Sequence, residues 1–285
     1  MNDKNLSNVL ADFETYLRCE VENSNLTVKK YLSETKRFLK WLYDDKHLTI
    51  AEINKKIILS FKDYLCEKYN NPDTINGKLG MNHIFLKFLG IGDITVKRLK
   101  VVKRNCKPSG RYVNEINYKK LIKCGKKKYT KAVIVAKIIA NTGIRASEVG
   151  HITYEMVVDG KIIVNNKGKI REIVLNKHIR RDLLKYCRRI GIRTGPVILN
   201  NRGNAYTRFG IWRMLKNLAK EMEVDTNTVF PHSFRHLFVV KHYSIHRDIE
   251  ALTNILGHSS TETTLIYLRK TVEEYGITMD IWYKK

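Results

Sequence analysis

Apolar residues in the first ninety positions recur at the spacing of amphipathic helices. The stripes run over residues 6–17, 28–42, 50–65 and 75–89, the last one following an Asn-Pro-Asp turn. Thr27 is a candidate N-cap for the second stripe, because a threonine hydroxyl can accept a hydrogen bond from the first helical turn. The pattern predicts four helices, and Gly77 and Gly80 weaken only the start of the fourth.

The pattern changes character from about residue 113 onward. Two short β-rich runs, 161–164 and 170–175, flank a loop-forming segment that contains Lys167 and Lys169, which is typical of a β-hairpin. Helical spacing occupies the other apolar stretches, 131–141, 177–190, 206–222, 233–244, 247–255 and 261–269. We therefore expect a mainly α fold with one small β-sheet in the second half of the chain.

Between the two halves lies a basic strap, residues 97–111, with seven basic residues and no acidic one. Phosphate contacts need only lysine or arginine at loose spacing, so the strap is a candidate DNA contact, and a solvated linker is the alternative. We expect a helical domain over 1–100, a basic linker over 101–112 and a second domain over 113–285, with a tail from about 270. The seven basic residues are Lys97, Arg98, Lys100, Lys103, Arg104, Lys107 and Arg111.

Charge and composition narrow the class of partner. The 285 residues carry a formal net charge of +25, and 43% are hydrophobic, which is enough for cores. Such an excess of positive charge repels itself unless a polyanion offsets it, and nucleic acid is the first candidate. No apolar run of membrane-spanning length and no signal peptide is present, so we expect no membrane partner. The five cysteines include no CxxC pair, so we expect no metal site and reduced thiols in a cytosolic compartment.

Three short segments concentrate chemically useful side chains. They read TGIRASE at 142–148, PHSFRH at 231–236 and LGHS at 256–259, with Tyr267 nine residues after His258. Arginine suits a phosphate because its planar fork stays charged and bonds two oxygens. Histidine handles protons near neutral pH, and tyrosine can attack phosphorus when a base or a cationic site assists it. Because the chain lacks an obvious acidic metal cluster, the set favours a metal-free transesterification at a phosphodiester.

Each segment alone has a plainer interpretation. An HxxR pair is commonly a surface feature, Tyr267 sits in an apolar helical stripe, and His258 follows a glycine at a helix end. The three segments gain weight from occurring together, in order, in one basic chain. Glu148, three residues after Arg145, could orient that arginine or another basic group.

The three segments resemble the active-site motifs of tyrosine recombinases, a family that includes the Xer proteins and phage-type integrases. The resemblance extends over nearly the whole chain, and it implies an N-terminal core-binding (SAM-like) domain and a C-terminal α+β catalytic domain. It implies Tyr267 as the nucleophile that forms a 3′-phosphotyrosyl bond, with Glu148 in support. The helper residues that it implies are Arg145, Lys167, His232, Arg235 and His258, and Lys169 is an alternative to Lys167.

The same resemblance implies double-stranded DNA as partner, four copies on two DNA sites, no cofactor, and a cytoplasmic, nucleoid-associated location. It implies a role in Xer-type resolution or in moving a mobile element. The tail after 270 would dock on a neighbouring copy or on its own domain. The stretch with Trp212 is a candidate for DNA-groove contact or a solvated basic face, and its basic residues are Arg208, Arg213 and Lys216. The rival functions are a type IB topoisomerase and a non-catalytic DNA-binding relative.

Overall fold

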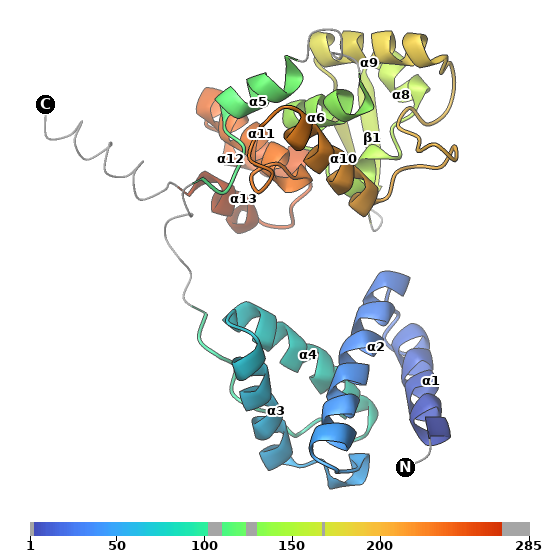
Figure 1. Cartoon of the computed structure of the whole chain (residues 1–285), viewed down its shortest axis with the longest axis vertical. Coiled ribbons are helices and arrows are strands. Elements are labelled where there is room, and N and C mark those ends of the chain that lie inside the picture. The colour runs from blue at the N-terminus through green and yellow to red at the C-terminus, as the bar shows by residue number, and fades with distance from the viewer. Residues whose placement is uncertain (1–2, 102–109, 124–129, 167–168, 270–285) are drawn as a thin grey trace, which may run out of the picture. The chain divides into compact units, whose positions relative to one another are not determined.

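The computed structural model describes residues 3–101, 110–123, 130–166 and 169–269. The chain divides into two compact units, Met1–Lys103 and Arg104–Lys285, each with a hydrophobic core of its own. Figure 1 shows helices throughout both units and a single hairpin in the second. No helix in these described ranges is long and apolar enough to cross a membrane.

The first unit is built from four α-helices, as the apolar stripes predicted. Aromatic side chains from different helices interlock in its core: the ring centroids of Phe13 and Phe85 are 5.1 Å apart, and those of Phe38 and Phe61 are 4.8 Å apart. The helices are α1 (Asp3–Cys19), α2 (Asn25–Lys40), α3 (Lys55–Lys68) and α4 (Pro72–Phe88), with a π-helix (Trp41–Asp45) after α2 and a 3-10 helix (Ile50–Glu52) before α3.

Two local predictions in this unit were wrong. Ser24, not Thr27, caps α2, because its side chain accepts a hydrogen bond from the Thr27 backbone and so places Thr27 inside the first turn. The third stripe is not one continuous helix, because the Asn54 side chain accepts hydrogen bonds from the Lys56 and Ile57 backbone and starts α3 afresh.

The first part of the basic strap packs on this unit. The Lys97 carbonyl accepts a hydrogen bond from Lys62 Nζ at 2.8 Å, and the backbone of Leu99 bonds to the Asn76 side chain through both its N–H and its carbonyl. The side chains of Lys97, Arg98 and Lys100 remain exposed. The strap's next three basic residues, Lys103, Arg104 and Lys107, lie outside the described residues.

The second unit surrounds the apolar helix α6 with other helices (Figure 1), and its fold confirms the prediction of a mainly α protein with a small sheet. Its strands form the predicted antiparallel hairpin, in which Ile162 pairs with Ile173 and Val164 with Arg171. The strands are β1 (Lys161–Asn166) and β2 (Lys169–Val174). The helices are α5 (Glu115–Ile122), α6 (Lys131–Thr142), α7 (Ala146–Val149), α8 (Tyr154–Asp159), α9 (Lys177–Ile190), α10 (Arg208–Glu221), α11 (Pro231–His246), α12 (Ile249–Leu256) and α13 (Thr261–Leu268).

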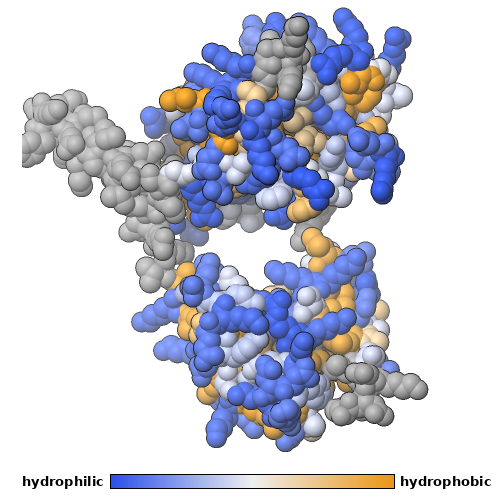
Figure 2. Space-filling view, in the orientation of Figure 1, coloured by the Kyte–Doolittle hydropathy of each residue, from blue (hydrophilic) through white to orange (hydrophobic). Residues whose placement is uncertain are grey.

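A small satellite core holds the end of this unit together. Val239 of α11, Leu252 and Leu256 of α12, and the ring of Tyr267 on α13 are all buried against one another. Because these side chains are packed together, the satellite core fixes the backbone that carries Tyr267. Elsewhere the visible face of the unit is mostly hydrophilic (Figure 2), as expected for a strongly basic chain.

Candidate active site

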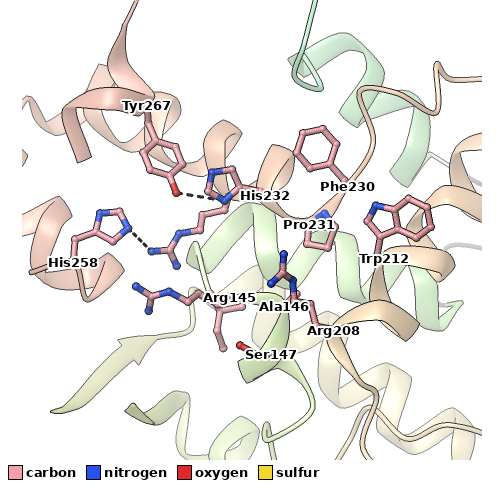
Figure 3. A pocket seen from close by; sticks show the side chains of 12 residues that line it. Arg145, Ala146, Ser147, Arg208, Trp212, Phe230, Pro231, His232, His258 and Tyr267 are labelled. Carbon is pink, nitrogen blue, oxygen red and sulfur yellow. Dashed lines mark hydrogen bonds between the residues drawn. The ribbon is translucent and has the colours of Figure 1, made fainter. Parts of the chain in front are cut away.

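The second unit contains a cavity of about 510 Å³ into which the three sequence segments converge (Figure 3). It brings together five of the six residues expected to carry the chemistry. Lys167, the sixth, lies outside the described residues, and of Lys169 only the backbone, paired with Asn166, is described. The lining residues are Ile144, Arg145, Ala146, Ser147, Arg208, Trp212, Phe230, Pro231, His232, Arg235, His258 and Tyr267.

Arg235 is the most firmly held cation of the site. It lies in the first turns of α11, which begins at Pro231, and it is 3% exposed. Its guanidinium donates to the Gly143 and Leu256 carbonyls and to Nε2 of His258. Burial, followed by the nearby charge of Arg145, lowers the pKa of Arg235 to about 10, which still leaves it charged at neutral pH.

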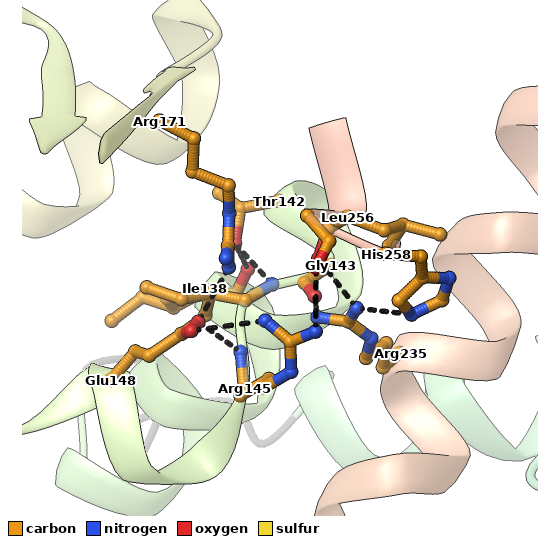
Figure 4. Close-up of polar contacts among 11 residues, drawn as sticks. Ile138, Thr142, Gly143, Arg145, Glu148, Arg171, Arg235, Leu256 and His258 are labelled. Carbon is orange, nitrogen blue, oxygen red and sulfur yellow. Dashed lines mark hydrogen bonds and ion pairs between the residues drawn. The ribbon is translucent and has the colours of Figure 1, made fainter. Parts of the chain in front are cut away.

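Arg145 stands beside Arg235 at the start of α7, where Glu148 holds it (Figure 4). The Glu148 carboxylate accepts the Arg145 backbone N–H at 2.8 Å and its Nη1 at 3.2 Å. Arg145 Nη2 also donates to the Gly257 carbonyl at 3.0 Å. The suggestion that Glu148 orients Arg145 therefore agrees with the geometry.

Gly143 supports this arrangement through its backbone conformation. It ends α6 with a φ of +64°, and a Cβ at this position would come within 2.5 Å of the Phe238 ring. Only glycine combines that left-handed conformation with such close packing at low cost. The turn directs the Gly143 carbonyl to Arg235 and leads directly into Arg145.

Arg171 of β2 is a third arginine of the site, and the sequence analysis missed it. Its guanidinium lies 2.6 Å from the second oxygen of Glu148 and packs against Gly257, where a Cβ would be 2.5 Å from Nη1. The sequence pattern could have indicated Arg171, because residues 171, 173 and 175 alternate onto one face of an extended segment. An arginine in line with the buried Ile173 and Leu175 must have a partner in the interior.

The two histidines of the site both favour the neutral form. Burial, and then the charge of Arg235, lowers the pKa of His232, and the same two causes lower the pKa of His258 to about 4. Since the Arg235 guanidinium can only donate, Nε2 of His258 accepts from it, and Nδ1 donates to the Thr264 hydroxyl at 2.8 Å. Nδ1 of His232 lies 3.4 Å from the Tyr267 hydroxyl oxygen.

The basic residues of α10 differ in their surroundings. Arg208 faces the cavity, Arg213 lies over the exposed Phe209 ring at 5.2 Å, and Lys216 donates to the Thr226 carbonyl. The ammonium of Lys216 also lies 5.3 Å from the centre of the Trp212 ring. The α10 side chains thus include a cation in the cavity, a cation on the surface and a cation turned inward.

The segment that enters the second unit carries one more expected DNA contact, Arg111. This residue is exposed and lies over the Tyr112 ring, which stacks on His236 at 4.1 Å. Val113, which follows Tyr112, donates its backbone N–H to the Ser233 hydroxyl at 2.6 Å. Arg111 is therefore anchored beside α11, and its charge contributes to the lowered pKa of His232.

The cavity combines two fixed guanidinium groups, two neutral imidazoles and a phenol. Among the described residues no three His, Cys, Asp or Glu side chains cluster as a metal site would require. Guanidinium pairs bind tetrahedral anions, and an imidazole beside a phenol can accept its proton. The fold and the site fit a class of protein that transfers a phosphoryl group to a tyrosine.

Comparison with known proteins identifies the family. Residues 111–274 match the model described as the phage integrase family, which is more than half of the chain. The chain therefore belongs to the phage integrase family. It is 26% identical to the tyrosine recombinase XerD of Oceanobacillus iheyensis, over 93% of this chain and 95% of the relative. It is also 26% identical to the tyrosine recombinase XerA of Pyrococcus furiosus, over 96% of this chain and 93% of the relative.

Solved structures show the same fold. The Tn1549 transposon integrase in complex with transposon right end DNA matches with a TM-score of 0.69 at 18% identity, over 95% of this chain and 98% of that chain. A lambda integrase dimer bound to a core site matches with a TM-score of 0.71 at 16% identity, over 92% and 76%. These findings confirm the resemblance and the prediction of a mainly α fold with a small sheet, and they do not favour the topoisomerase or the non-catalytic alternative.

Proposed function

We propose that this chain, a tyrosine site-specific recombinase by family, cleaves and rejoins double-stranded DNA through a covalent bond to Tyr267. One observation carries the assignment. The Tyr267 hydroxyl lies 3.4 Å from Nδ1 of His232, an imidazole whose lowered pKa keeps it free to accept a proton. Arg235 and Arg145 line the same cavity as Tyr267 and are both held in place by hydrogen bonds; Figure 3 shows Arg145 and Tyr267 in this cavity.

The proposed step forms one bond to phosphorus and breaks another. The Tyr267 oxygen attacks phosphorus, its proton passes to His232, and the bond between phosphorus and the 5′ oxygen breaks. The products are a 3′-phosphotyrosyl bond and a DNA end with a 5′ hydroxyl. Rejoining reverses these events, so it needs no external energy source.

The two arginines stabilise the charge that grows on the nonbridging oxygens. Their N–H groups are already directed by carbonyls and by Glu148 before DNA enters, so little reorganisation is required. We assign His258 a contact to the same phosphate, because its ring lies beside Arg235 and stacks by Tyr267 at 5.8 Å. The contact requires the tautomer with the proton on Nε2, in which Nδ1 accepts from the Thr264 hydroxyl and Nε2 exchanges Arg235 for a phosphate oxygen. Glu148 and Arg171 act as positioning residues that hold this group together.

A lysine of the hairpin donates the proton to the departing 5′ oxygen. Lys167 is our first candidate and Lys169 our second. A bridging 5′-sulfur in the DNA distinguishes them, since a thiolate leaves without a proton. The alanine variant of the true acid loses cleavage on normal DNA and regains it on the sulfur-containing DNA, whereas the other variant shows no such rescue.

DNA is the partner that the charge and the structural relatives favour, since the structure of the Tn1549 transposon integrase is a complex with transposon right end DNA. We propose that residues 1–100 form a core-binding domain, that 101–112 link it to the catalytic domain, and that the seven strap residues contact phosphates. Arg208 and Arg213 contact DNA from α10. Lys216 would have to give up its bond to Thr226 to join them.

We further propose four copies acting on two DNA sites, in Xer-type resolution or in the movement of a mobile element. We also propose that the protein acts in the cytoplasm, associated with the nucleoid. Sequencing the DNA that a trapped protein carries distinguishes resolution from mobile-element movement, because a chromosomal site supports the first and element ends support the second.

A nicked DNA that loses a short 5′-hydroxyl strand after cleavage tests the chemistry, because it traps the covalent protein–DNA adduct. We expect an adduct with the wild type and none with Tyr267→Phe. Tyr243→Phe, which removes a hydroxyl from the neighbouring helix, should retain it. An undiminished adduct with Tyr267→Phe would refute the assignment. Relaxation of supercoiled DNA that lacks paired sites would instead support a topoisomerase.

A further inference from the structure

The cavity extends beyond the groups that the chemistry uses. We call the part of the cavity lined by Arg145, Arg235 and Tyr267 its inner half, and the part lined by Arg208, Trp212 and further residues its outer half. The total volume of about 510 Å³ falls in the range, roughly 300–1,000 Å³, of pockets that bury a drug-sized ligand. A single phosphate leaves much of that space unfilled. The remaining outer-half residues are Ala146, Ser147, Phe230 and Pro231.

Arg208 is the charged group of this outer half. It is the first residue of α10, and its guanidinium extends into the cavity (Figure 3). Within the part of the chain that the structure describes, its side chain makes no hydrogen bond and no ion pair. Its charge is the smallest of the causes, after burial, Arg235 and Arg111, that lower the pKa of His232.

This isolation sets Arg208 apart from the other arginines nearby. Arg145 and Arg171 are both bonded to Glu148, and Arg235 is bonded to two carbonyls and to a histidine. A guanidinium group in a cavity that already contains two other arginines is repelled by them. A second anion that enters with the substrate would relieve this repulsion.

The wall beside Arg208 is apolar, and a lysine contacts its aromatic rings. Trp212 is 40% exposed, which is high for so large an aromatic side chain, and Phe230 and Pro231 continue the surface. The Lys216 ammonium lies 5.3 Å from the centre of the Trp212 ring and 5.7 Å from that of Phe230, and it is bonded to Thr226. Such a wall suits the carbon face of a deoxyribose and does not suit an anion.

We propose that the outer half of the cavity is a second phosphate subsite. Arg208 binds the phosphodiester adjacent to the scissile one on the same strand, and Trp212 packs against the sugar between the two phosphates. The proposal rests on the proposed function, because that function places the scissile phosphate in the inner half. Arg208 thereby sets the position of the strand along the cavity, so that the scissile phosphorus meets Tyr267.

Neutralising single phosphates tests this assignment. Nicked DNA would carry one methylphosphonate at either neighbour of the scissile phosphate, and the rate of adduct formation would be measured for wild type and Arg208→Gln. Arg189→Gln, which removes an exposed arginine of α9 outside the cavity, is the matched control. Thermal unfolding of each variant verifies that it is folded.

We expect one of the two methylphosphonates to slow the wild type by about 10-fold or more, as the loss of a charged hydrogen bond predicts. Arg208→Gln should be slowed by a similar factor on normal DNA and should be insensitive to that same methylphosphonate. Arg189→Gln should keep the wild-type sensitivity. These results together would establish the subsite.

Two results would overturn the subsite. One is cleavage of normal DNA by Arg208→Gln at the wild-type rate, and the other is wild-type sensitivity of that variant to both methylphosphonates. Either result leaves the Tyr267 adduct intact, whereas failure of the proposed function appears as no wild-type adduct on unmodified DNA. The two failures are therefore distinguishable.

Discussion

Helices α10 and α11 follow one another along the chain and line the same cavity, yet they present their cations in opposite ways. Arg235 of α11 is 3% exposed and its guanidinium donates several hydrogen bonds, whereas Arg208 of α10 is exposed and its side chain makes no hydrogen bond or ion pair among the described residues. Groups that stabilise a transition state act best when they are fixed in advance. Groups that bind substrate can remain unpaired until the substrate supplies the anion.

The largest expected effect comes from changing Arg235, the cation that is fixed in place. Arg235→Lys keeps the positive charge but cannot reach two carbonyls and a phosphate at once. We expect adduct formation to slow by about 10²–10³-fold, the usual cost of losing one preorganised donor. Single-turnover cleavage at saturating protein measures this loss. A lysine variant with the wild-type rate would show that charge alone suffices and that the fixed geometry is unimportant.

The next effect comes from the shared carboxylate. Glu148→Gln leaves Arg145 and Arg171 without their common anion in a site where all three are mostly buried. We expect the free energy of unfolding to fall by about 2–3 kcal/mol, somewhat below the cost of breaking a fully buried pair. Chemical denaturation measures it.

Arg171→Gln offers the control, because it removes one of the two partners of the same carboxylate. Its loss of stability should overlap with that of Glu148→Gln, so the double variant should cost less than the sum of the two. Strictly additive losses would show that Arg171 does not act through Glu148.

The third expected effect concerns pH. The pKa of folded His258 is held at about 4 by burial and by Arg235, below the value of about 6.5 in an unfolded chain. The unfolded chain therefore binds the proton first as the pH falls. The stability that neutral His258 contributes is complete above pH ~6.5 and is lost as the pH falls toward about 4. Thermal unfolding of wild type and His258→Asn across this range should show a steeper acid loss for the wild type, and parallel curves would contradict it.

The smallest expected effect comes from changing Arg213, an exposed cation of α10. Arg213 lies on the surface over Phe209, so Arg213→Ala should change the stability by no more than about 0.5 kcal/mol. If it contacts a phosphate, the slope of log affinity against log salt should fall by about one. Binding titrations at several salt concentrations check this. An unchanged slope would remove Arg213 from the DNA contacts.

The sequence predicts those parts of the fold that depend on a long periodic pattern. The apolar stripes of α9 and α11 are long enough to be recognised, and the hairpin is marked by its two β-rich runs. The helices α7 and α8, of four and six residues, were not predicted, because each has too few turns to display a period. Helix α5 was also missed, although it has eight residues, as many as the predicted helices α12 and α13. Their ends depend on caps such as Thr153, whose bond to the Met156 backbone is visible only in three dimensions.

The site divides in the same way. Arg145, Arg235 and Tyr267 stand in short motifs with recognisable order and spacing, so the sequence alone indicated them. Arg171 has no motif of its own. Its importance arises because the hairpin folds against Glu148 and Gly257, which are 23 residues before it and 86 after it by their numbering. Contacts that join distant segments of the chain leave no local periodicity to read.

The central claim is that Tyr267 itself becomes bonded to DNA, and direct identification of the modified residue tests it best. The wild-type adduct on nicked DNA would be digested with protease and nuclease, and the peptide that carries the residual nucleotide would be sequenced by mass spectrometry. The account predicts a single phosphotyrosyl linkage at Tyr267. A linkage at any other tyrosine, or at a serine or histidine, would contradict it.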